Sequence, residues 1–172
     1  MRKVLYNIFY YLYFIVNTVK RIFKLDEFIF IWRYAKWKYK LMKIGKNVKF
    51  FKGVIIHSAH KVSIGSKVGV GDYVQMWGGG EIEIGNDVLI ATHSVITSQG
   101  HDVNADVFWK TSVSDKVIIE DNVWLGAGVL VMPGVTIGKN SIIGAGSVVV
   151  KNIPENSIAV GAPADVIKRR KK

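Results

Sequence analysis

The sequence predicts an all-β parallel helix of about five triangular coils, preceded by amphipathic α-helices. Three observations carry this prediction. Near the end of the chain, aliphatic residues stand six positions apart, at Ile119, Leu125, Val131, Ile137, Ile143 and Val149. An Ile-Gly pair recurs every twenty residues, beginning at positions 44, 64 and 84. Residues 1–43 lack both periods and hold thirteen of the twenty aromatic residues.

Residues 1–43 have the pattern of basic, aromatic helices. They contain ten Lys or Arg residues against Asp26 and Glu27, a net charge of +8 out of +11 for the chain. On a wheel of 100° per residue, the wide apolar side of the first segment faces a narrow polar stripe of Lys3, Asn7, Asn17 and Arg21. A second amphipathic segment runs from Asp26 to Met42. Such helices bind the headgroup layer of anionic membranes, so we expect membrane-surface attachment.

Other interpretations of this region fit less well. A secretory signal would end in a small-residue cleavage site, which the stretch TVKRIFK does not offer. A spanning helix needs about twenty apolar residues, and Val4 to Val19 gives sixteen with two Asn. A soluble helical cap on the prism is the remaining alternative. Nucleic acid is not expected as a partner, because it would leave the apolar faces unexplained. We therefore expect the protein to be located at the cytoplasmic face of the cell membrane.

Residues 44–164 form the predicted prism. Each six-residue unit has an inward aliphatic residue followed four positions later by Val or a small residue, which indicates a short strand and a tight turn. Three strands close a coil in eighteen residues, so the twenty-residue period is one coil with two extra corner residues. We expect coils near residues 44, 64, 84, 119 and 137. A sandwich of ordinary strands would not keep this phase.

The six-residue register breaks once. Counting from Ile96, the next inward position is 102, but the phase resumes at Ile119. A loop of about residues 98–117 is therefore extruded, and His101 stands near its start. Loops that leave a rigid scaffold often carry function. After the prism, residues 165–172 form a basic C-terminal tail. The chain has no Cys, which fits a reducing cytoplasm without requiring one.

Residues 122–168, NVWLGAGVLVMPGVTIGKNSIIGAGSVVVKNIPENSIAVGAPADVIK, resemble the last coils and closing segment of galactoside and maltose acetyltransferases. These enzymes belong to the hexapeptide-repeat acyltransferase family, and the resemblance covers about residues 44–168. It implies a left-handed coil, acetyl-CoA as acyl donor, and a homotrimer with active sites between subunits. No metal is expected, because His57, His60 and His93 lack the spacing of the zinc-binding β-helix enzymes.

His101 is the candidate catalytic base. Acyl transfer from a thioester to a hydroxyl needs a base that is neutral near pH 7, and imidazole meets this need. The resembling acetyltransferases open their loop with a histidine at this place. The alternative is a structural role, in which a loop histidine is hydrogen-bonded to a carbonyl. Glu81, twenty residues earlier, and the adjacent Asp102 are candidates for orienting the ring, although Glu81 also fits a solvated corner charge.

The same resemblance supplies candidates for substrate binding. The pantetheine arm of coenzyme A lies along the C-terminal coils in that family, and the matching positions are Trp124, Gly126, Ala127, Ala145 and Lys151. Arg169, in the basic tail, is expected to meet the phosphates. For the acceptor saccharide, Gln75 and Trp77 are candidates, because an aromatic ring can stack on a sugar face. Packing beneath Gly78-Gly79-Gly80 is the alternative for Trp77.

These features predict an acetyl-CoA-dependent O-acetyltransferase. The expected acceptor is a saccharide hydroxyl, on a lipid-linked or surface-polysaccharide precursor. The resemblance implies direct attack of the hydroxyl on the thioester, and the chain has no Cys to carry an acyl intermediate. The alternatives are an N-acetyltransferase of a nucleotide-linked amino sugar, a drug-inactivating acetyltransferase, and a non-catalytic membrane-recruited repeat scaffold.

Overall fold

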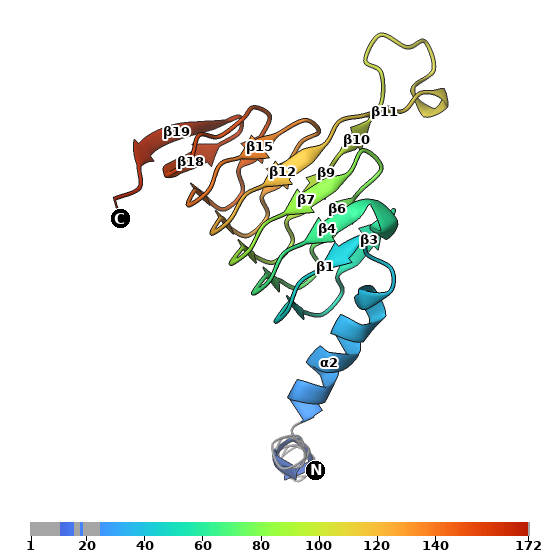
Figure 1. Cartoon of the computed structure of the whole chain (residues 1–172), viewed down its shortest axis with the longest axis vertical. Coiled ribbons are helices and arrows are strands. Elements are labelled where there is room, and N and C mark those ends of the chain that lie inside the picture. The colour runs from blue at the N-terminus through green and yellow to red at the C-terminus, as the bar shows by residue number, and fades with distance from the viewer. Residues whose placement is uncertain (1–10, 16–17, 19–24, 172) are drawn as a thin grey trace, which may run out of the picture.

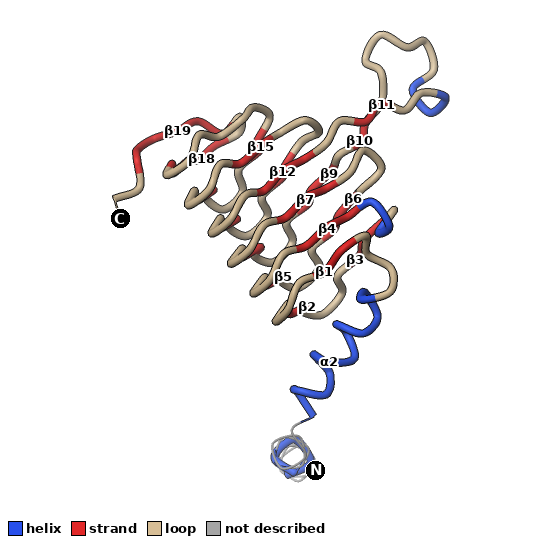
Figure 2. The backbone as a smooth tube through the Cα atoms, in the orientation of Figure 1, coloured by secondary structure: helices blue, strands red, loops and turns tan. Residues whose placement is uncertain are grey.

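The computed structural model describes residues 11–15, 18 and 25–171. One helix, α2 (Leu25–Lys38), leads into a prism of short parallel strands (Figures 1 and 2). The first amphipathic segment expected from the sequence, over residues 3–23, lies largely outside the described residues. The second expected segment, from Asp26 to Met42, is helical to Lys38, after which the chain turns into the prism.

Three strands make each coil of the prism. The first coil contains β1 (Lys43–Ile44), β2 (Lys49–Phe50) and β3 (Ile55–His57), followed by the corner helix η1 (Ala59–Lys61). The second contains β4 (Val62–Ile64), β5 (Gly69–Val70) and β6 (Gln75–Trp77), and the third β7 (Ile82–Ile84), β8 (Leu89–Ile90) and β9 (Val95–Thr97). The fourth contains β12 (Val117–Ile119), β13 (Trp124–Leu125) and β14 (Leu130–Val131). The fifth contains β15 (Thr136–Ile137), β16 (Ile142–Ile143) and β17 (Val148–Val149).

A sixth, partial coil follows the five that the sequence predicts. Ile153 bridges to Ile137, and β18 (Ser157–Gly161) pairs in parallel with β16. The period predicted five coils because Ile153 and Ala159 replace the strict six-residue phase after Val149. The chain then reverses into β19 (Ala164–Arg169), antiparallel to β18. Most of the segment expected as a basic tail is therefore a strand.

The coils stack into three flat faces. Face A consists of β1, β4, β7, β12 and β15; face B of β2, β5, β8, β13, β16, β18 and β19; and face C of β3, β6, β9, β14 and β17. Ile44, Ile64, Ile84, Ile119 and Ile137 stand in register on face A. The predicted twenty-residue period is thus the vertical repeat of a parallel β-solenoid, and the arrangement is consistent with a left-handed coil.

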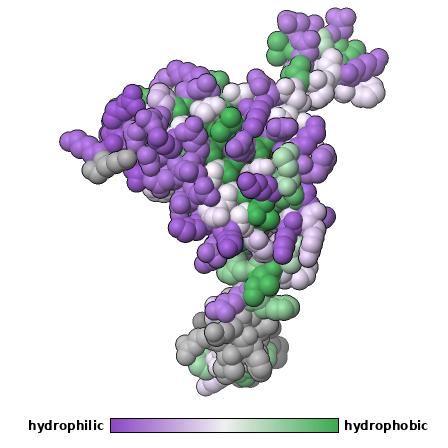
Figure 3. Space-filling model, in the orientation of Figure 1, coloured by the Kyte–Doolittle hydropathy of each residue, from purple (hydrophilic) through white to green (hydrophobic). Residues whose placement is uncertain are grey.

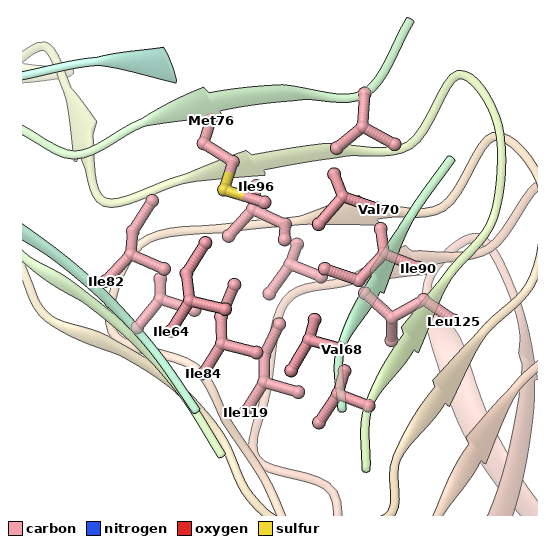
Figure 4. Packing of buried hydrophobic residues seen from close by; sticks show 14 of the residues in the cluster. Ile64, Val68, Val70, Met76, Ile82, Ile84, Ile90, Ile96, Ile119 and Leu125 are labelled. Carbon is pink, nitrogen blue, oxygen red and sulfur yellow. The ribbon is translucent and has the colours of Figure 1, made fainter. Parts of the chain in front are cut away.

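The core fills the centre of the prism. Alternating residues of each short strand point inward from all three faces, as Figure 4 shows for Ile64, Ile90 and Ile96. The inward isoleucines are at most 2% exposed from the second coil to the fifth. Buried serines sit at the inward corner positions, where Ser94 Oγ donates a hydrogen bond to the Gly126 carbonyl at 3.0 Å. Each layer therefore buries its inward side chains against the next.

Corner residues adopt the left-handed backbone conformation that lets the chain turn sharply. At the corner between faces A and B, φ lies between 55° and 61° in Asn47, Lys67, Asp87, Asn122, Asn140 and Asn156. Asparagine tolerates this conformation well. Its amides also join the layers, because Asn122 donates to Asn140 at 2.8 Å and Asn140 donates to Asn156 at 3.0 Å. The corner between faces B and C has Gly53, Tyr73, His93, Gly128 and Gly146 in the same conformation.

The helix α2 covers the open end of the first coil. Trp37, in the last turn of the helix, and Leu41, just after it, are 6% and 7% exposed and belong to the core. The other side of α2 stays open to solvent, where Phe28, Ile31 and Trp32 are each more than 60% exposed. Among the described residues, no helix has the length and apolar character needed to cross a membrane.

Candidate active site

The extruded loop leaves the prism at the corner between faces C and A. β10 (Gln99–Gly100) and β11 (Val113–Ser114) pair antiparallel and form its stem, and the short helix η2 (Phe108–Lys110) lies on the returning side of the loop, just before the stem. Figure 1 shows the loop projecting away from the stacked coils. The prism resumes when Val117 pairs with Ile82. The loop therefore lies between β9 and β12.

His101 stands where the loop begins, directly after the stem. Its Nδ1 atom lies 2.6 Å from the carbonyl oxygen of Thr111 on the returning strand. A carbonyl can only accept, so Nδ1 carries the proton and Nε2 is left as the basic nitrogen of a neutral ring. The side chain is exposed. The hydrogen bond to a carbonyl, which was the alternative interpretation of this histidine, is therefore present, and it leaves Nε2 without the proton.

Thr111 also fastens the base of the loop. Its hydroxyl donates to the Phe108 carbonyl at 3.0 Å and accepts from the amide of Asp102 at 3.2 Å. Sequence reasoning missed this residue. The available signal was the run Thr111-Ser112-Val113 at the return of the loop, since β-branched residues favour an extended strand that would bring Thr111 opposite Asp102 and next to His101.

The two carboxylates expected to orient the ring, Asp102 and Glu81, have other partners. Asp102 accepts a hydrogen bond at 2.9 Å from the amide of Asn104 and so stabilises its own turn. Glu81 lies below Lys116, at 3.9 Å, because Lys116 and not His101 completes the next layer at this corner. The chain has already left the prism at Gln99, which breaks the vertical column. Neither carboxylate contacts the His101 ring in the described part of the chain.

Lys116 holds a charge cluster on face A. Its Nζ lies 2.7 Å from Glu83 as well as near Glu81. The hydrogen bond to Glu83 raises the pKa of Lys116 above its usual value, and the negative charges of Glu83 and Glu81 act in the same direction, while partial desolvation opposes them. The cluster is solvent-exposed, and it fixes the strand that re-enters the prism after the loop.

A corner of bare backbone lies between faces B and C on the fourth and fifth coils. Gly126-Ala127-Gly128 stacks on Gly144-Ala145-Gly146, and a Cβ on Gly126 would come within 2.6 Å of the Ala145 nitrogen. Ala127 and Ala145 are exposed. Their amide N–H groups take no part in the hydrogen bonds found over residues 25–171. Two stacked donors on an open surface suit the amide carbonyls of a pantetheine arm.

The other residues expected to bind coenzyme A are more dispersed. Trp124 lies on the outer side of face B, 49% exposed, in register with Leu89 and Ile142. Lys151 lies at the corner between faces C and A, where its Nζ pairs with Asp165 at 2.6 Å. Arg169 donates to the Glu155 carbonyl at 2.8 Å. The structure thus groups Gly126, Ala127 and Ala145, and separates Lys151 and Arg169 from them.

Gln75 and Trp77 lie on the outer side of face C, on β6. The indole of Trp77 stacks on the imidazole of His57 in the layer before, with ring centroids 4.0 Å apart and planes 20° apart. Thr97 is in register with Trp77 in the layer after. One face of the indole is therefore covered, which limits its use as a platform for a sugar. Gln75, two positions earlier, is half-buried.

The described residues do not form a metal site. No group of three or more His, Asp or Glu side chains there is placed to hold an ion. His93 stacks on Tyr73, with centroids 5.3 Å apart, and His57 is occupied by Trp77. These two histidines pack against aromatic rings of neighbouring layers.

The sequence profile of the bacterial transferase hexapeptide family, of six repeats, matches residues 116–151. The chain is 35% identical over 144 residues to the Escherichia coli K12 protein WcaF, named for acetyl transfer in colanic acid biosynthesis, covering 84% of this chain and 78% of WcaF.

Two further relatives agree with this. Galactoside O-acetyltransferase of Lactococcus lactis is 48% identical over 91 residues, which cover 52% of this chain and 44% of that enzyme. The solved structure of galactoside acetyltransferase in complex with coenzyme A superposes with a TM-score of 0.77 at 30% identity, covering 81% of this chain and 70% of that one. The chain belongs to the hexapeptide-repeat acetyltransferase family, and the resemblance drawn from its sequence is confirmed.

Proposed function

We propose that the protein transfers an acetyl group from acetyl-CoA to a hydroxyl of a saccharide. The observation that carries the proposal is the exposed imidazole of His101, whose Nδ1 is held by the Thr111 carbonyl so that Nε2 is free to accept a proton. The relative that binds coenzyme A and the relatives named for acetyl transfer support the donor. Galactoside O-acetyltransferase supports a sugar hydroxyl as the acceptor.

The chemistry follows from this geometry. Nε2 takes the proton of the acceptor hydroxyl as its oxygen attacks the thioester carbonyl carbon, and a C–O bond forms. The C–S bond then breaks, and the imidazolium returns the proton to the departing thiolate sulfur. The Thr111 carbonyl stabilises the imidazolium through Nδ1–H, in the role that a carboxylate has in other sites. The amides of Ala127 and Ala145 align the donor.

We further propose a homotrimer in which two chains complete each site. Within one chain, His101 and the amides of Ala127 and Ala145 lie at opposite edges of face C, so a donor held at the corner of one chain suits the histidine of another. Face C exposes an apolar column of Leu130, Met132 and Val150, each at least 38% exposed. Burial of such a column between chains is favourable.

For the acceptor, we propose a lipid-linked or surface-polysaccharide precursor at the cytoplasmic face of the cell membrane. One relative is named for colanic acid biosynthesis. The exposed aromatic side of α2 and the basic charge of residues 1–43 support attachment of the enzyme at the membrane surface. Attachment would keep the enzyme where a lipid-linked acceptor is found.

The test is an acceptor screen with the purified full-length chain. Acetyl-CoA is incubated with neutral saccharides and with nucleotide-linked amino sugars, and both released thiol and product mass are followed. We expect acetyl esters of saccharides, loss of at least about a hundredfold in rate for His101→Ala, and a nearly normal rate for His60→Ala, which alters another exposed histidine. Amide products would instead establish the N-acetyltransferase alternative. A rate unchanged in His101→Ala would refute the role of this residue.

A further inference from the structure

The first coil has a charge pattern unlike the rest of the prism. Residues 43–61 contain five lysines and no acidic residue, whereas residues 62–167 contain five lysines and eleven acidic residues. On the later coils, Lys67, Lys116, Lys139 and Lys151 each pair with a carboxylate. No ion pair found among the described residues involves Lys43, Lys46, Lys49 or Lys52. The end of the prism next to α2 is therefore strongly cationic.

A pocket lies between α2 and this coil. It has a volume of about 410 Å³ and is lined by Phe30, Ile31 and Tyr34 from α2 and by Lys46, Asn47 and Val48 from the corner that follows β1. One wall is thus aromatic and aliphatic, while Lys46 brings an amine to the other side. Figure 3 shows apolar surface where the prism meets α2.

Several contacts hold the pocket in shape. The Tyr34 hydroxyl donates to the Gly45 carbonyl at 3.2 Å. The ring of Phe30 meets Phe51 edge-on, with centroids 5.2 Å apart, and the Lys49 ammonium lies 5.9 Å from the centre of the Phe30 ring. The side chains of Lys46 and Lys49 make no hydrogen bond in the described structure; only their backbone groups join the next coil. Two amines beside the apolar wall are free for an anion.

The surroundings indicate what kind of molecule fits. Ile31, at the rim, is 64% exposed, and Phe28 and Trp32 on the same helix are 63% and 62% exposed. Exposed aromatic side chains beside unpaired lysines are typical of surfaces that bind the headgroup layer of anionic bilayers. A phosphate with an attached hydrocarbon chain matches both walls of the pocket. Nucleic acid would satisfy only the lysines.

We propose that this pocket binds one anionic phospholipid of a bilayer, with its phosphate at Lys46 and Lys49 and its acyl chain against Phe30, Ile31 and Val48. The proposal rests on the membrane attachment proposed above and adds a lipid site on the prism itself. It makes the first coil, and not the helices alone, part of the membrane-binding surface. Attachment then depends on headgroup charge as well as on apolar insertion.

The experiment measures binding of the full-length chain to phosphatidylcholine vesicles and to vesicles that also contain phosphatidylglycerol. The double variant Lys46→Ala/Lys49→Ala is compared with Lys67→Ala/Lys139→Ala, which removes the same charge from lysines that have carboxylate partners. Loss of two lysines at the surface should weaken binding to the anionic vesicles roughly 30-fold, and the control variant should bind nearly as well as the parent. Ile31→Ser should weaken binding to both kinds of vesicle.

Other results would overturn the site. Equal losses in the two double variants would show that net charge alone acts. Displacement from vesicles by inorganic phosphate would indicate a site for a soluble phosphate, and preference for an oligonucleotide over anionic vesicles would indicate nucleic acid. Acetyl transfer to a soluble saccharide is measured in parallel. We expect it to be normal in both double variants, so failure of lipid binding and failure of the proposed catalysis remain distinguishable.

Discussion

The Nδ1 atom of His101 and the carbonyl oxygen of Thr111 lie 2.6 Å apart, across the base of the extruded loop. A backbone carbonyl has a fixed position and does not titrate, so it selects one tautomer at every pH at which the ring is neutral. The Thr111 hydroxyl makes the other hydrogen bonds at the base of the loop, because it donates to the Phe108 carbonyl and accepts from the Asp102 amide. Loop geometry and the tautomer of His101 are therefore coupled.

Thr111→Val tests this coupling. Valine keeps the size and shape of threonine but removes both hydroxyl hydrogen bonds, so the Thr111 carbonyl is less firmly positioned. We expect kcat to fall about 10- to 100-fold with the KM for acetyl-CoA nearly unchanged. Ser112→Ala, which alters the neighbouring exposed hydroxyl, serves as the matched control. An increase in KM with kcat preserved would show that Thr111 acts on binding and not on the base.

The free amides at the corner between faces B and C give a second prediction. Ala127→Leu and Ala145→Leu place bulk on an exposed surface, which the fold tolerates, but cover the stacked donors. The KM for acetyl-CoA should rise at least about tenfold, because one to two hydrogen bonds are lost. Melting temperature should change little, as in the control Ala35→Leu on α2. Normal KM values in both variants would place the donor elsewhere.

The stack of His57 on Trp77 predicts an energetic coupling between two layers. His57→Ala, Trp77→Ala and the double variant form a thermodynamic cycle, measured by denaturant unfolding. We expect the free energies of unfolding to be non-additive by about 0.5–1.5 kcal/mol, as for stacked ring pairs. Additive effects, combined with a raised KM for the acceptor in Trp77→Ala alone, would favour sugar stacking on the indole instead.

The apolar column on face C predicts how the chain assembles. Leu130→Arg places a charge on this apolar surface and should shift the protein from the mass of three 19.2 kDa chains to that of one, as read by light scattering. Ser63→Arg on face A is the control and should leave the mass unchanged. If the parent chain is itself monomeric, the proposal of a trimer fails.

Lys116 gives a prediction at alkaline pH. Its pKa is raised mainly by the hydrogen bond to Glu83, so the folded chain holds this proton more tightly than the unfolded chain. The resulting stabilisation is fully present below the ordinary lysine pKa of about 10.5 and is lost as pH rises through the higher folded value. The gap in melting temperature between the parent and Glu83→Gln should therefore close in strong alkali. A gap independent of pH would contradict this.

The sequence predicted what depends on local period. The inward positions of face A appear as an Ile-Gly repeat because each residue meets its counterpart one coil away. The start of the loop was predictable too, since the register lapses there. The hydrogen-bond partner of the His101 ring was not predictable, because only the pairing of β10 with β11 brings the Thr111 carbonyl to His101. Extrapolating the period past Gln99 placed Glu81 below His101, whereas Lys116 fills that layer.

The pocket at the first coil was also not predictable from the sequence period. Its lysines are visible in the sequence, but the pocket beside Lys46 depends on how α2 meets β2, and no period encodes that angle. Lys151 was assigned from the resemblance, and Arg169 from the charge of the basic tail. Lys151 lies at the corner between faces C and A, whereas Ala145, six residues earlier, lies at the corner between faces B and C, because six residues carry the chain along one side of the triangular cross-section.

The strand β19 has a consequence for growth of the molecule. A stack of parallel coils is open-ended, and each exposed rim could template another copy into a fibre. At one rim, β19 runs against the direction of the coils, with a bulge between Ile158 and Ala159, and at the other Trp37 and Leu41 cover the core. Both ends of the solenoid are thus capped, which makes polymerisation along its axis unfavourable. The flat sides remain as the surfaces through which copies can associate.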